Sequence, residues 1–596
     1  MKDYGFIRVA AASPRVRVAD VAFNTGEICT LISEAEEKGV SLVAFPELSV
    51  TGSTCGDLLG NTRLLRAAEE GIEKIRAYTE GHRIAAVVGA PLLKENELHN
   101  CAVVIMDGKV AGCVSQTGFP DEDGKRPVFT LGGVSFGVGV GEALPAPGTD
   151  LILHLVASNE TYGKHAARKR SIGGYSEQTV SGYVYACSGY GESTQDAVYA
   201  GASMIFENGR LLAENERFQT GSSMIVADID VDSLRALRRS GHASATGQAW
   251  RKVDLGAAAP TDFEAQLCRE SDPYPFLAKK GQENELCLET LDIQTLGLAY
   301  RLEHIGAKKA VLGISGGLDS TLALLVTVRA FDKLGIPRSG IIGITMPGLG
   351  TSSRTRGNAW TLMEKLGITA REIPIADSVE QHFRDIGHSG NIKDTAYENA
   401  QARERTQILM DVANMEGGLV VGTGDLSELA LGWCTYNGDH MSMYAVNASI
   451  PKTQVRQLCT WAAEHLFPEA GETLRDIVAT PISPELKKEG EGGITQLTED
   501  MIGPYELNDF YLYHFLRFGA GPDKIGFLAR KAFKGTYDDE TIHKWLRNFL
   551  RRFFSQQFKR SCMPDGPQAG PVSLSPRGGW KMPSDAAPDT FLKDCF

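Results

Sequence analysis

The stretch AVLGISGGLDSTLALLVTVRAF, Ala310–Phe331, decides the fold of the carboxyl-terminal half of this 596-residue chain. An apolar strand runs into the turn Ser315–Ser320, and an apolar helical run follows the turn directly. A strand, a glycine-rich turn and a helix amino terminus together present free N–H groups and a positive dipole end to an anion. The stretch therefore predicts an α/β unit that binds a phosphate at this turn.

The residue types within the turn indicate how it would hold a nucleotide. Gly316 and Gly317 let a phosphate approach the backbone, and Ser315 and Ser320 add hydroxyl donors. Asp319 alone would repel a phosphate, so we interpret it as a ligand of a Mg²⁺ ion that bridges phosphates. An ordinary strand-to-helix turn is the competing interpretation. The motif resembles that of the ATP pyrophosphatase families, which cleave ATP to AMP and pyrophosphate.

Three further segments carry polar residues in a distinctive order. YENAQARERTQILM, Tyr397–Met410, is a helical stretch whose polar positions could also be a solvated face. GTGDLSELALGWCTYNGD, Gly422–Asp439, is a strand end and one helical turn, and NASIPKT, Asn447–Thr453, follows it. Their polar and aromatic residues of interest are Asn399, Arg403, Arg405, Asp425, Glu428, Trp433, Tyr436 and Lys452.

Together these segments resemble the NAD synthetase family over Leu286–Ser575. The resemblance is more specific than SGGLDS alone, which GMP synthetases, asparagine synthetases and tRNA-thiolating enzymes also carry. It implies a Rossmann-like, doubly wound ATP-pyrophosphatase domain that amidates deamido-NAD. In that reaction the nicotinate carboxylate attacks the α-phosphorus of ATP, and ammonia then displaces AMP from the adenylate. A dimer of synthetase domains, or a larger homo-oligomer, is also implied.

The resemblance implies a role for each matching position. The ATP site would comprise Ile314, Ser315, Gly316, Gly317, Leu318, Asp319, Ser320, Thr321 and Thr423. Asp319 and Glu428 would hold Mg²⁺, and Lys452 would meet the triphosphate. The deamido-NAD site would comprise Asn399, Glu428, Trp433, Cys434, Thr435, Tyr436 and, in the late run QFKRS, Lys559. The polar stretch Ser483–Tyr505 is either a lid or a plain surface loop.

The amino-terminal half alternates short strands and helices. Its segments VAFPELSVTG (Val43–Gly52), VVGAP (Val87–Pro91), LHNCAVVI (Leu98–Ile105) and MIFENGRLLAE (Met204–Glu214) resemble the nitrilase-type amidase domain that many bacterial NAD synthetases use as a glutaminase. The resemblance implies an α-β-β-α sandwich with a Glu–Lys–Cys triad. In such a triad the cysteine attacks the glutamine amide, the glutamate moves the proton and the lysine stabilises the oxyanion.

Only one triad member is recognisable in this sequence. Glu47 occupies the glutamate position, but SQTGFP places Gln116 at the lysine and VSFGVGVGEAL places Gly141 at the cysteine. Lys125 could replace the lysine only if its loop shifted, and Cys101, Cys113 and Cys187 are the nearest thiols. Because glycine offers no nucleophile and glutamine no charge, we expect a pseudo-glutaminase. Ammonia would then come from solution or from a partner amidase.

Length, net charge and cysteine content limit the possible domain organisation and partners. The length predicts two domains, at residues 1–235 and 286–596, with a connector at 236–285. A net charge of −13 argues against broad affinity for nucleic acid or anionic membranes. The chain has no apolar run near the ~18 residues of a membrane span, and its 11 scattered cysteines favour a reducing cytoplasm. Two alternatives stay open: an amidohydrolase with an unusual nucleophile, and a non-catalytic nucleotide-binding protein.

Overall fold

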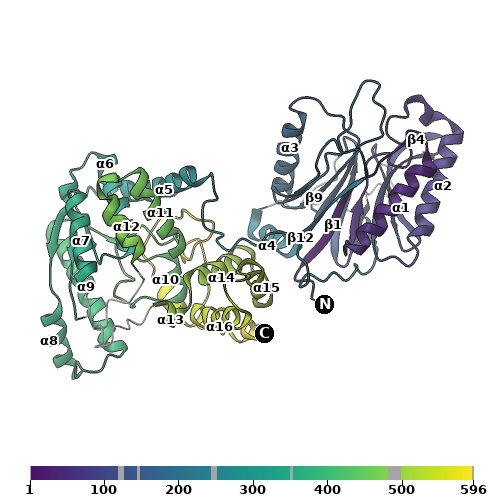
Figure 1. The fold of residues 1–596 in the computed structure, drawn as a ribbon. Coiled ribbons are helices and arrows are strands. Elements are labelled where there is room, and N and C mark those ends of the chain that lie inside the picture. The colour runs from purple at the N-terminus through teal and green to yellow at the C-terminus, as the bar shows by residue number, and fades with distance from the viewer. Residues whose placement is uncertain are drawn as a thin grey trace. The chain divides into compact units, whose positions relative to one another are not determined.

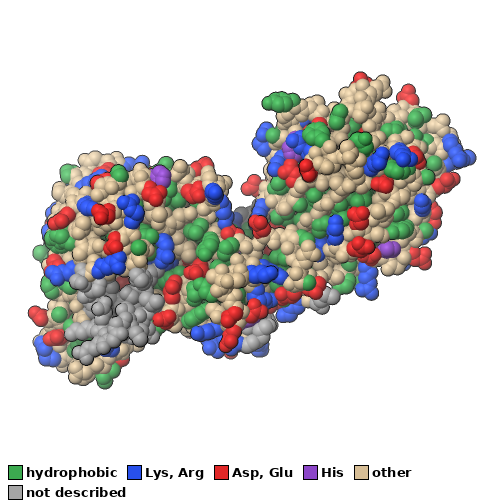
Figure 2. All heavy atoms as spheres, in the orientation of Figure 1, with side chains coloured by type: hydrophobic (Ala, Val, Ile, Leu, Met, Phe, Trp, Pro, Cys, Tyr) green, Lys and Arg blue, Asp and Glu red, His purple; other side chains and the backbone are tan. Residues whose placement is uncertain are grey.

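The computed structural model describes residues 2–117, 127–143, 148–242, 251–349, 353–480 and 498–593. The chain divides into two compact units, Met1–Glu270 and Ser271–Phe596, and Figure 1 shows both. Among the described residues, none of the helices combines the length and apolar character that crossing a membrane requires. On the face shown in Figure 2, acidic and basic side chains are interspersed over both units.

The amino-terminal unit is the expected α-β-β-α sandwich. Its two sheets have the strand orders β12-β1-β2-β3-β4-β5 and β11-β10-β9-β8-β7-β6-β13, and they face each other. Helices α1 (Val21–Glu37) and α2 (Thr62–Tyr78) cover the first sheet, and α3 (Lys164–Thr179) covers the second. The strands are β1 (Phe6–Ser13), β2 (Leu42–Ala44), β3 (Ala85–Lys94), β4 (Glu97–Met106), β5 (Lys109–Ser115), β6 (Pro127–Leu131), β7 (Val134–Val140), β8 (Leu151–Val156), β9 (Gly182–Cys187), β10 (Met204–Glu207), β11 (Arg210–Glu214), β12 (Ser223–Asp230) and β13 (Arg251–Asp254).

Hydrophobic patterning accounts for the layers of this unit. Every side chain of β8 is buried, because one face of its sheet meets the other sheet and the opposite face meets α3. Helix α2 buries a stripe at helical spacing and begins at Asn61, whose side chain accepts a hydrogen bond from the N–H of Arg63. The stripe comprises Leu64, Leu65, Ala68, Ile72 and Ile75.

The segment expected as a connector is divided between the two units. Strand β13 pairs in parallel with β6, and the short helix α4 (Val231–Leu237) precedes it. Two contacts fasten the chain beyond β13: Arg269 forms an ion pair with Glu207 at 2.7 Å, and Arg8 donates to the carbonyl of Gln266 at 2.7 Å. Residues up to Glu270 therefore belong to the amino-terminal unit.

The carboxyl-terminal unit is the expected doubly wound fold. All pairings in its five-stranded sheet are parallel, in the order β16-β15-β14-β17-β18. Its strands are β14 (Ala310–Gly313), β15 (Ile341–Thr345), β16 (Thr369–Glu372), β17 (Leu419–Gly422) and β18 (Tyr444–Ala445). The chain order reverses at β14, which is the topological switch point where ligands bind in such sheets.

Helices pack on both faces of this sheet. One core cluster joins α5, α6, α7, α11 and α12 to the sheet, and a second joins α8 and α9 to its other face. The helices are α5 (Glu283–His304), α6 (Leu318–Leu334), α7 (Ser353–Lys365), α8 (Ala376–Ile386), α9 (Thr395–Glu416), α10 (Leu426–Leu431), α11 (Lys452–His465), α12 (Gly471–Ala479), α13 (Thr498–Ile502), α14 (Tyr505–Phe518), α15 (Pro522–Ala532), α16 (Asp539–Ser555), α17 (Gln557–Arg560) and α18 (Asp589–Leu592).

Candidate active site

A cavity of about 710 Å³ opens at the carboxyl ends of β14 and β17. Most of the residues that sequence analysis selected in this unit line it: Ile314, Ser315, Gly316, Gly317, Leu318, Asp319, Ser320, Asn399, Thr423, Glu428, Trp433, Cys434, Thr435, Lys452 and Lys559. Thr321 and Tyr436 are not among its lining residues. Thr321 is fully buried on α6, and Tyr436 stacks on His440 at 5.1 Å.

The glycine-rich turn is shaped by its packing as well as by any ligand. Gly316 has φ +87°, and a Cβ atom there would lie 2.2 Å from the carbonyl oxygen of Thr355 at the start of α7. Only glycine fits that close approach. The Ser315 hydroxyl accepts from the N–H of Gly317 at 3.1 Å and lies 3.2 Å from the Ser320 hydroxyl. The first residues of α6, Leu318, Asp319 and Ser320, line the cavity.

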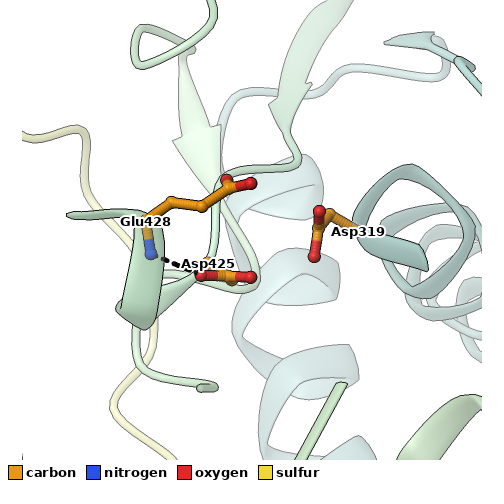
Figure 3. A group of neighbouring side chains, drawn as sticks. All are labelled: Asp319, Asp425 and Glu428. Atoms are coloured by element: carbon orange, nitrogen blue, oxygen red, sulfur yellow. Dashed lines mark hydrogen bonds between the residues drawn. The ribbon is translucent and has the colours of Figure 1, made fainter. Parts of the chain in front are cut away.

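Three carboxylates and one ammonium meet beside this turn. Figure 3 shows Asp319, Asp425 and Glu428 converging from α6 and from the start of α10. The Nζ of Lys452, whose side chain is 3% exposed, lies 2.6 Å from Asp319, 2.8 Å from Asp425 and 3.0 Å from Glu428. Fully ionised, the four groups carry a net charge of −2.

The electrostatics reflect that excess of negative charge. Burial raises the pKa of Glu428 to about 7, and the carboxylates of Asp319 and Asp439 contribute, while Lys452 opposes the shift. Burial also raises the pKa of Asp425. Burial alone would lower the pKa of Lys452, but the three carboxylates raise it well above its usual range. Among the described residues, Asp319 Oδ1 is buried without a hydrogen-bond partner.

Asp425 belongs to this carboxylate cluster, and sequence analysis assigned it no role. Its Oδ1 accepts from the N–H of Glu428 at 2.8 Å and so caps α10, while its other oxygen faces Lys452. The spacing D-x-x-E is that of a capping box, so a signal was present in the sequence. Asp425 therefore fixes both Glu428 and Lys452.

Another buried carboxylate, Asp509 of α14, binds the residues beside Asp425 and Lys452. Asp509 accepts from the hydroxyl of Ser427 and from the N–H and hydroxyl of Thr453, at 3.1 and 2.7 Å for Thr453. The Ser427 hydroxyl in turn accepts from the N–H of Lys452 at 2.8 Å. Burial raises the pKa of Asp509 to about 6. The contact joins α10, α11 and α14 behind the carboxylate cluster.

Cations from the carboxyl-terminal helices hold the end of α10. Lys559 Nζ donates to the carbonyls of Gly432 and Cys434 at 2.8 and 2.7 Å, and Arg552 donates to Leu431 at 3.0 Å. Arg560, which is buried, donates to the carbonyls of Leu429 and Ala430. Cations at a helix carboxyl terminus satisfy orphan carbonyls and the negative dipole end. The contacts position the Trp433–Thr435 turn, and Arg552 also lies 5.3 Å from the Trp433 ring centre.

Helix α9 meets that turn from the opposite side. Asn399 accepts from the Thr435 hydroxyl at 2.8 Å, and Thr435 N–H donates to Asp439 at 2.7 Å. Arg405 lines the cavity and donates to the carbonyl of Met346 at 3.2 Å, whereas Arg403 is exposed and donates to the carbonyl of Tyr436. Of the expected lid, residues 483–497 lie outside the described part of the chain.

The three positions of the expected glutaminase triad also come together, in the amino-terminal unit. A Cβ atom built on Gly141 would lie 2.7 Å from Gln116 Nε2 and 3.2 Å from Glu47 Oε1. Asn100 donates to Glu47 at 2.5 Å and to Gln116 at 3.1 Å, and the N–H of Ala157 donates to Glu47 at 2.8 Å. Burial raises the pKa of Glu47, although both donors oppose it.

The nearby thiols have the properties of structural cysteines. Cys101 and Cys187 are fully buried. The neighbouring Cys113 raises the pKa of Cys101, and burial raises the pKa of Cys187. Because the thiolate is the nucleophilic form, these environments disfavour reactivity. Lys125, the other candidate substitute, lies outside the described residues.

Comparisons with known proteins match a different family to each of the two units. A family model of NAD synthase matches residues 291–516, and one of carbon-nitrogen hydrolase matches residues 8–130. The glutamine-dependent NAD(+) synthetase of Mycobacterium tuberculosis is 36% identical over 99% of this chain and 98% of its own length, and that of Thermotoga maritima is 26% identical over 97% and 98%. A crystal structure of a glutamine-dependent NAD(+) synthetase from Cytophaga hutchinsonii covers 99% of this chain and 100% of its own, with 20% identity and a TM-score of 0.44.

Proposed function

Because the chain belongs to the glutamine-dependent NAD(+) synthetase family, we propose that it amidates deamido-NAD at the expense of ATP but takes its nitrogen from ammonia and not from glutamine. The observation that carries this proposal is the pairing of Gly141 with Gln116 beside Glu47. Thioester formation needs a thiolate at one fixed point and a cation or donors at the oxyanion. The two residues supply neither a thiol nor a charge.

Glu47 by itself cannot restore the reaction. It can move a proton, but in this arrangement it has no nucleophile to activate, and Asn100 and the Ala157 N–H already occupy its oxygens. Of the nearest thiols, Cys101 and Cys187 are fully buried and Cys113 is half-buried. The carbon-nitrogen hydrolase match includes Glu47 and Gln116 but ends before Gly141. The amino-terminal unit is thus a retained scaffold in this proposal.

In the synthetase unit, the glycine-rich turn and the start of α6 would hold the ATP phosphates. Asp319, Asp425 and Glu428 would hold a Mg²⁺ ion, since an oxygen donor set, a net charge of −2 and the orphaned Asp319 Oδ1 suit a divalent cation. Bound there, the ion would neutralise charge on the phosphates. Lys452 would neutralise the remainder, with its position fixed by Asp425 and by the Ser427 hydroxyl.

The dinucleotide would lie against the Trp433–Thr435 turn. Asn399 binds Thr435, and Lys559 binds the carbonyls of Gly432 and Cys434 on either side of Trp433, so they would orient the nicotinate carboxylate toward the α-phosphorus. A closed site would protect the adenylate from water until ammonia arrives.

The ten cysteines in the described part of the chain are free thiols, which supports the expected cytoplasmic location.

One assay tests the nitrogen source directly. The full chain is incubated with ATP, Mg²⁺ and deamido-NAD, and with either ammonium or glutamine freed of ammonium, while NAD, AMP, pyrophosphate and glutamate are measured. We expect NAD, AMP and pyrophosphate in equal amounts with ammonium, and no glutamate with glutamine. Glutamate formed at a rate comparable with NAD would refute the loss of glutaminase activity. Absence of NAD with both donors would refute the synthetase role.

A further inference from the structure

The three carboxylates of the cluster come from two separate parts of the chain. Figure 3 shows Asp319, on α6, facing Asp425 and Glu428, which stand at the start of α10. The strands before these helices, β14 and β17, lie side by side, but their paired residues end at Val311 and Val420. Because Mg²⁺ takes its oxygen ligands at about 2.0–2.1 Å, an ion shared by the three carboxylates requires the two backbones to be held at a set distance beyond that pairing.

The buried amide of Asn447 bridges those two backbones. Its Nδ2 donates to the carbonyl of Asp319 at 2.9 Å and to the carbonyl of Thr423 at 3.1 Å, and the residue is fully buried. Thr423 directly follows β17 and precedes the start of α10. A primary amide has two N–H donors, so Asn447 uses one on each side of the cluster. Lys452 joins the same two sides through their side chains, whereas Asn447 joins them through the main chain.

Gln294 of α5 fixes the orientation of that amide. Its Nε2 donates to Asn447 Oδ1 at 3.1 Å and to the carbonyl of Val446 at 2.9 Å. If either amide were turned over, its oxygen would face carbonyl acceptors, and at least two hydrogen bonds would be lost. Gln294 is also fully buried, and its Oε1 has no hydrogen-bond partner among the described residues. The fold therefore tolerates an unpaired buried acceptor, which costs stability, at the residue that orients Asn447.

The segment from Asn447 to Lys452 contacts α10 at two further points. The carbonyl of Ile450 accepts from the N–H of Leu426 at 2.9 Å, and the N–H of Lys452 donates to the Ser427 hydroxyl at 2.8 Å. The bridging amide and the ammonium thus lie on one short segment that is fixed to the first turn of α10.

We propose that Asn447 is a positioning residue: it sets the separation of Asp319 from Asp425 and Glu428 at which one Mg²⁺ ion can bind, and Gln294 orients its amide. This role rests on the proposed function, because it presupposes that the cluster binds Mg²⁺ together with ATP. Asn447 is not among the residues that line the cavity, so it acts through the backbone that carries the ligands.

Asn447→Leu keeps the branching of the side chain, adds no charge and removes both donors. We expect it to raise at least tenfold the Mg²⁺ concentration that gives half-maximal affinity for α,β-methylene-ATP, measured by calorimetry on the full chain. The dissociation constant for deamido-NAD should change less than twofold, because Asn399 and Lys559 hold the Trp433–Thr435 turn without Asn447. A purely structural role would weaken the binding of both ligands together.

Asn24→Leu is the matched control. Asn24 lies in the amino-terminal unit, is equally buried, and bridges the carbonyls of Arg17 and Val50 through its Nδ2 at 3.0 and 3.1 Å. Its substitution should lower the free energy of unfolding comparably and leave the Mg²⁺ requirement unchanged. Gln294→Met leaves both Asn447 donors in place, so it should raise the Mg²⁺ requirement by a smaller factor. It reports on the bridge even where Asn447→Leu does not fold.

Equal Mg²⁺ requirements for Asn447→Leu and Asn24→Leu would overturn the positioning role. So would a loss of deamido-NAD affinity as large as the loss for the ATP analogue or, where Asn447→Leu does not fold, an unchanged requirement in Gln294→Met. Failure of the proposed metal site is recognised separately, because Mg²⁺ would then leave the affinity of the unsubstituted chain for the analogue unchanged.

Discussion

A Cβ atom on Gly141 would lie 2.7 Å from Nε2 of Gln116, so the residue at 116 fills the space beside the position of a nucleophile. Gly141 also has φ +59°, a conformation that costs a side chain about 1–2 kcal/mol. We expect Gly141→Ala to lower the free energy of unfolding by that amount plus a contact term of about 1 kcal/mol. Gly133→Ala isolates the backbone cost, because Gly133 has φ +79° and open space around it. If chemical denaturation gave the same loss of unfolding free energy for Gly141→Ala and Gly133→Ala, Gln116 would not restrict the space at position 141.

Restoring the thiol alone should not restore catalysis. In Gly141→Cys the new side chain stands against an uncharged Gln116, so the oxyanion still lacks its cation. We expect glutamate release from glutamine to stay at the background of the unsubstituted chain. Mass spectrometry after alkylation would verify that the new thiol is present. Release at a rate comparable with NAD formation would show that Gln116 suffices as an oxyanion donor.

Much of the fold could be predicted because apolar runs carry the strands. The apolar runs Ile7–Ala12, Leu151–Val156 and Ile341–Thr345 of the sequence coincide with β1, β8 and β15 within about a residue at each end. Strand β13 could not be predicted, because Arg251–Asp254 has no apolar period and exists through its pairing with β6.

Site residues could be predicted where they lie close together in one short segment of the sequence. The turn Ser315–Ser320 carries its own signature, but Thr321 follows it on α6, and the rotation of about 100° per residue turns it into the core. Arg552 and Arg560 were missed because their carbonyl partners on α10 lie more than a hundred residues earlier in the chain. Such contacts depend on tertiary packing and leave no mark in local spacing.

Removing the ammonium from the carboxylate cluster should cost both stability and activity. Lys452→Met leaves three carboxylates near one another without a cation, and breaking a buried ion pair typically costs about 3–5 kcal/mol. Pyrophosphate release should fall by orders of magnitude in Lys452→Met, Asp319→Ala and Glu428→Ala. If the cluster binds Mg²⁺, the ion should raise the melting temperature of Lys452→Met more than that of the unsubstituted chain. Equal shifts would remove the carboxylates from the metal site.

Lys559 tests how the carboxyl terminus supports the dinucleotide. Its two carbonyl partners, Gly432 and Cys434, flank Trp433 of the turn proposed to face deamido-NAD and do not belong to the phosphate turn. We expect Lys559→Ala to raise the KM for deamido-NAD several-fold more than the KM for ATP, with little change in kcat. Lys534→Ala, an exposed lysine after α15, is the control. Equal effects on both substrates would indicate a general loss of folding.

His154 should make the amino-terminal unit sensitive to acid. Its Nε2 donates to the Gly141 carbonyl at 2.7 Å, and its Nδ1 lies 2.7 Å from the Tyr183 hydroxyl, which donates to it when the ring is neutral. Burial lowers the pKa of His154 from 6.5 to about 4, although the Gly141 carbonyl opposes the shift. Between these values the unfolded chain binds the extra proton, so stability rises with pH there.

The contribution of His154 is therefore fully present above pH 6.5 and is lost as the pH falls toward 4. At 1.36 kcal/mol per pKa unit it amounts to about 3 kcal/mol. NMR titration should show the His154 ring still neutral at pH 5.5. The free energy of unfolding of His154→Gln should depend less on pH over this range than that of the unsubstituted chain. A ring that titrates near pH 6.5, or identical pH profiles for the two chains, would show that Gly141 is not held by a neutral imidazole.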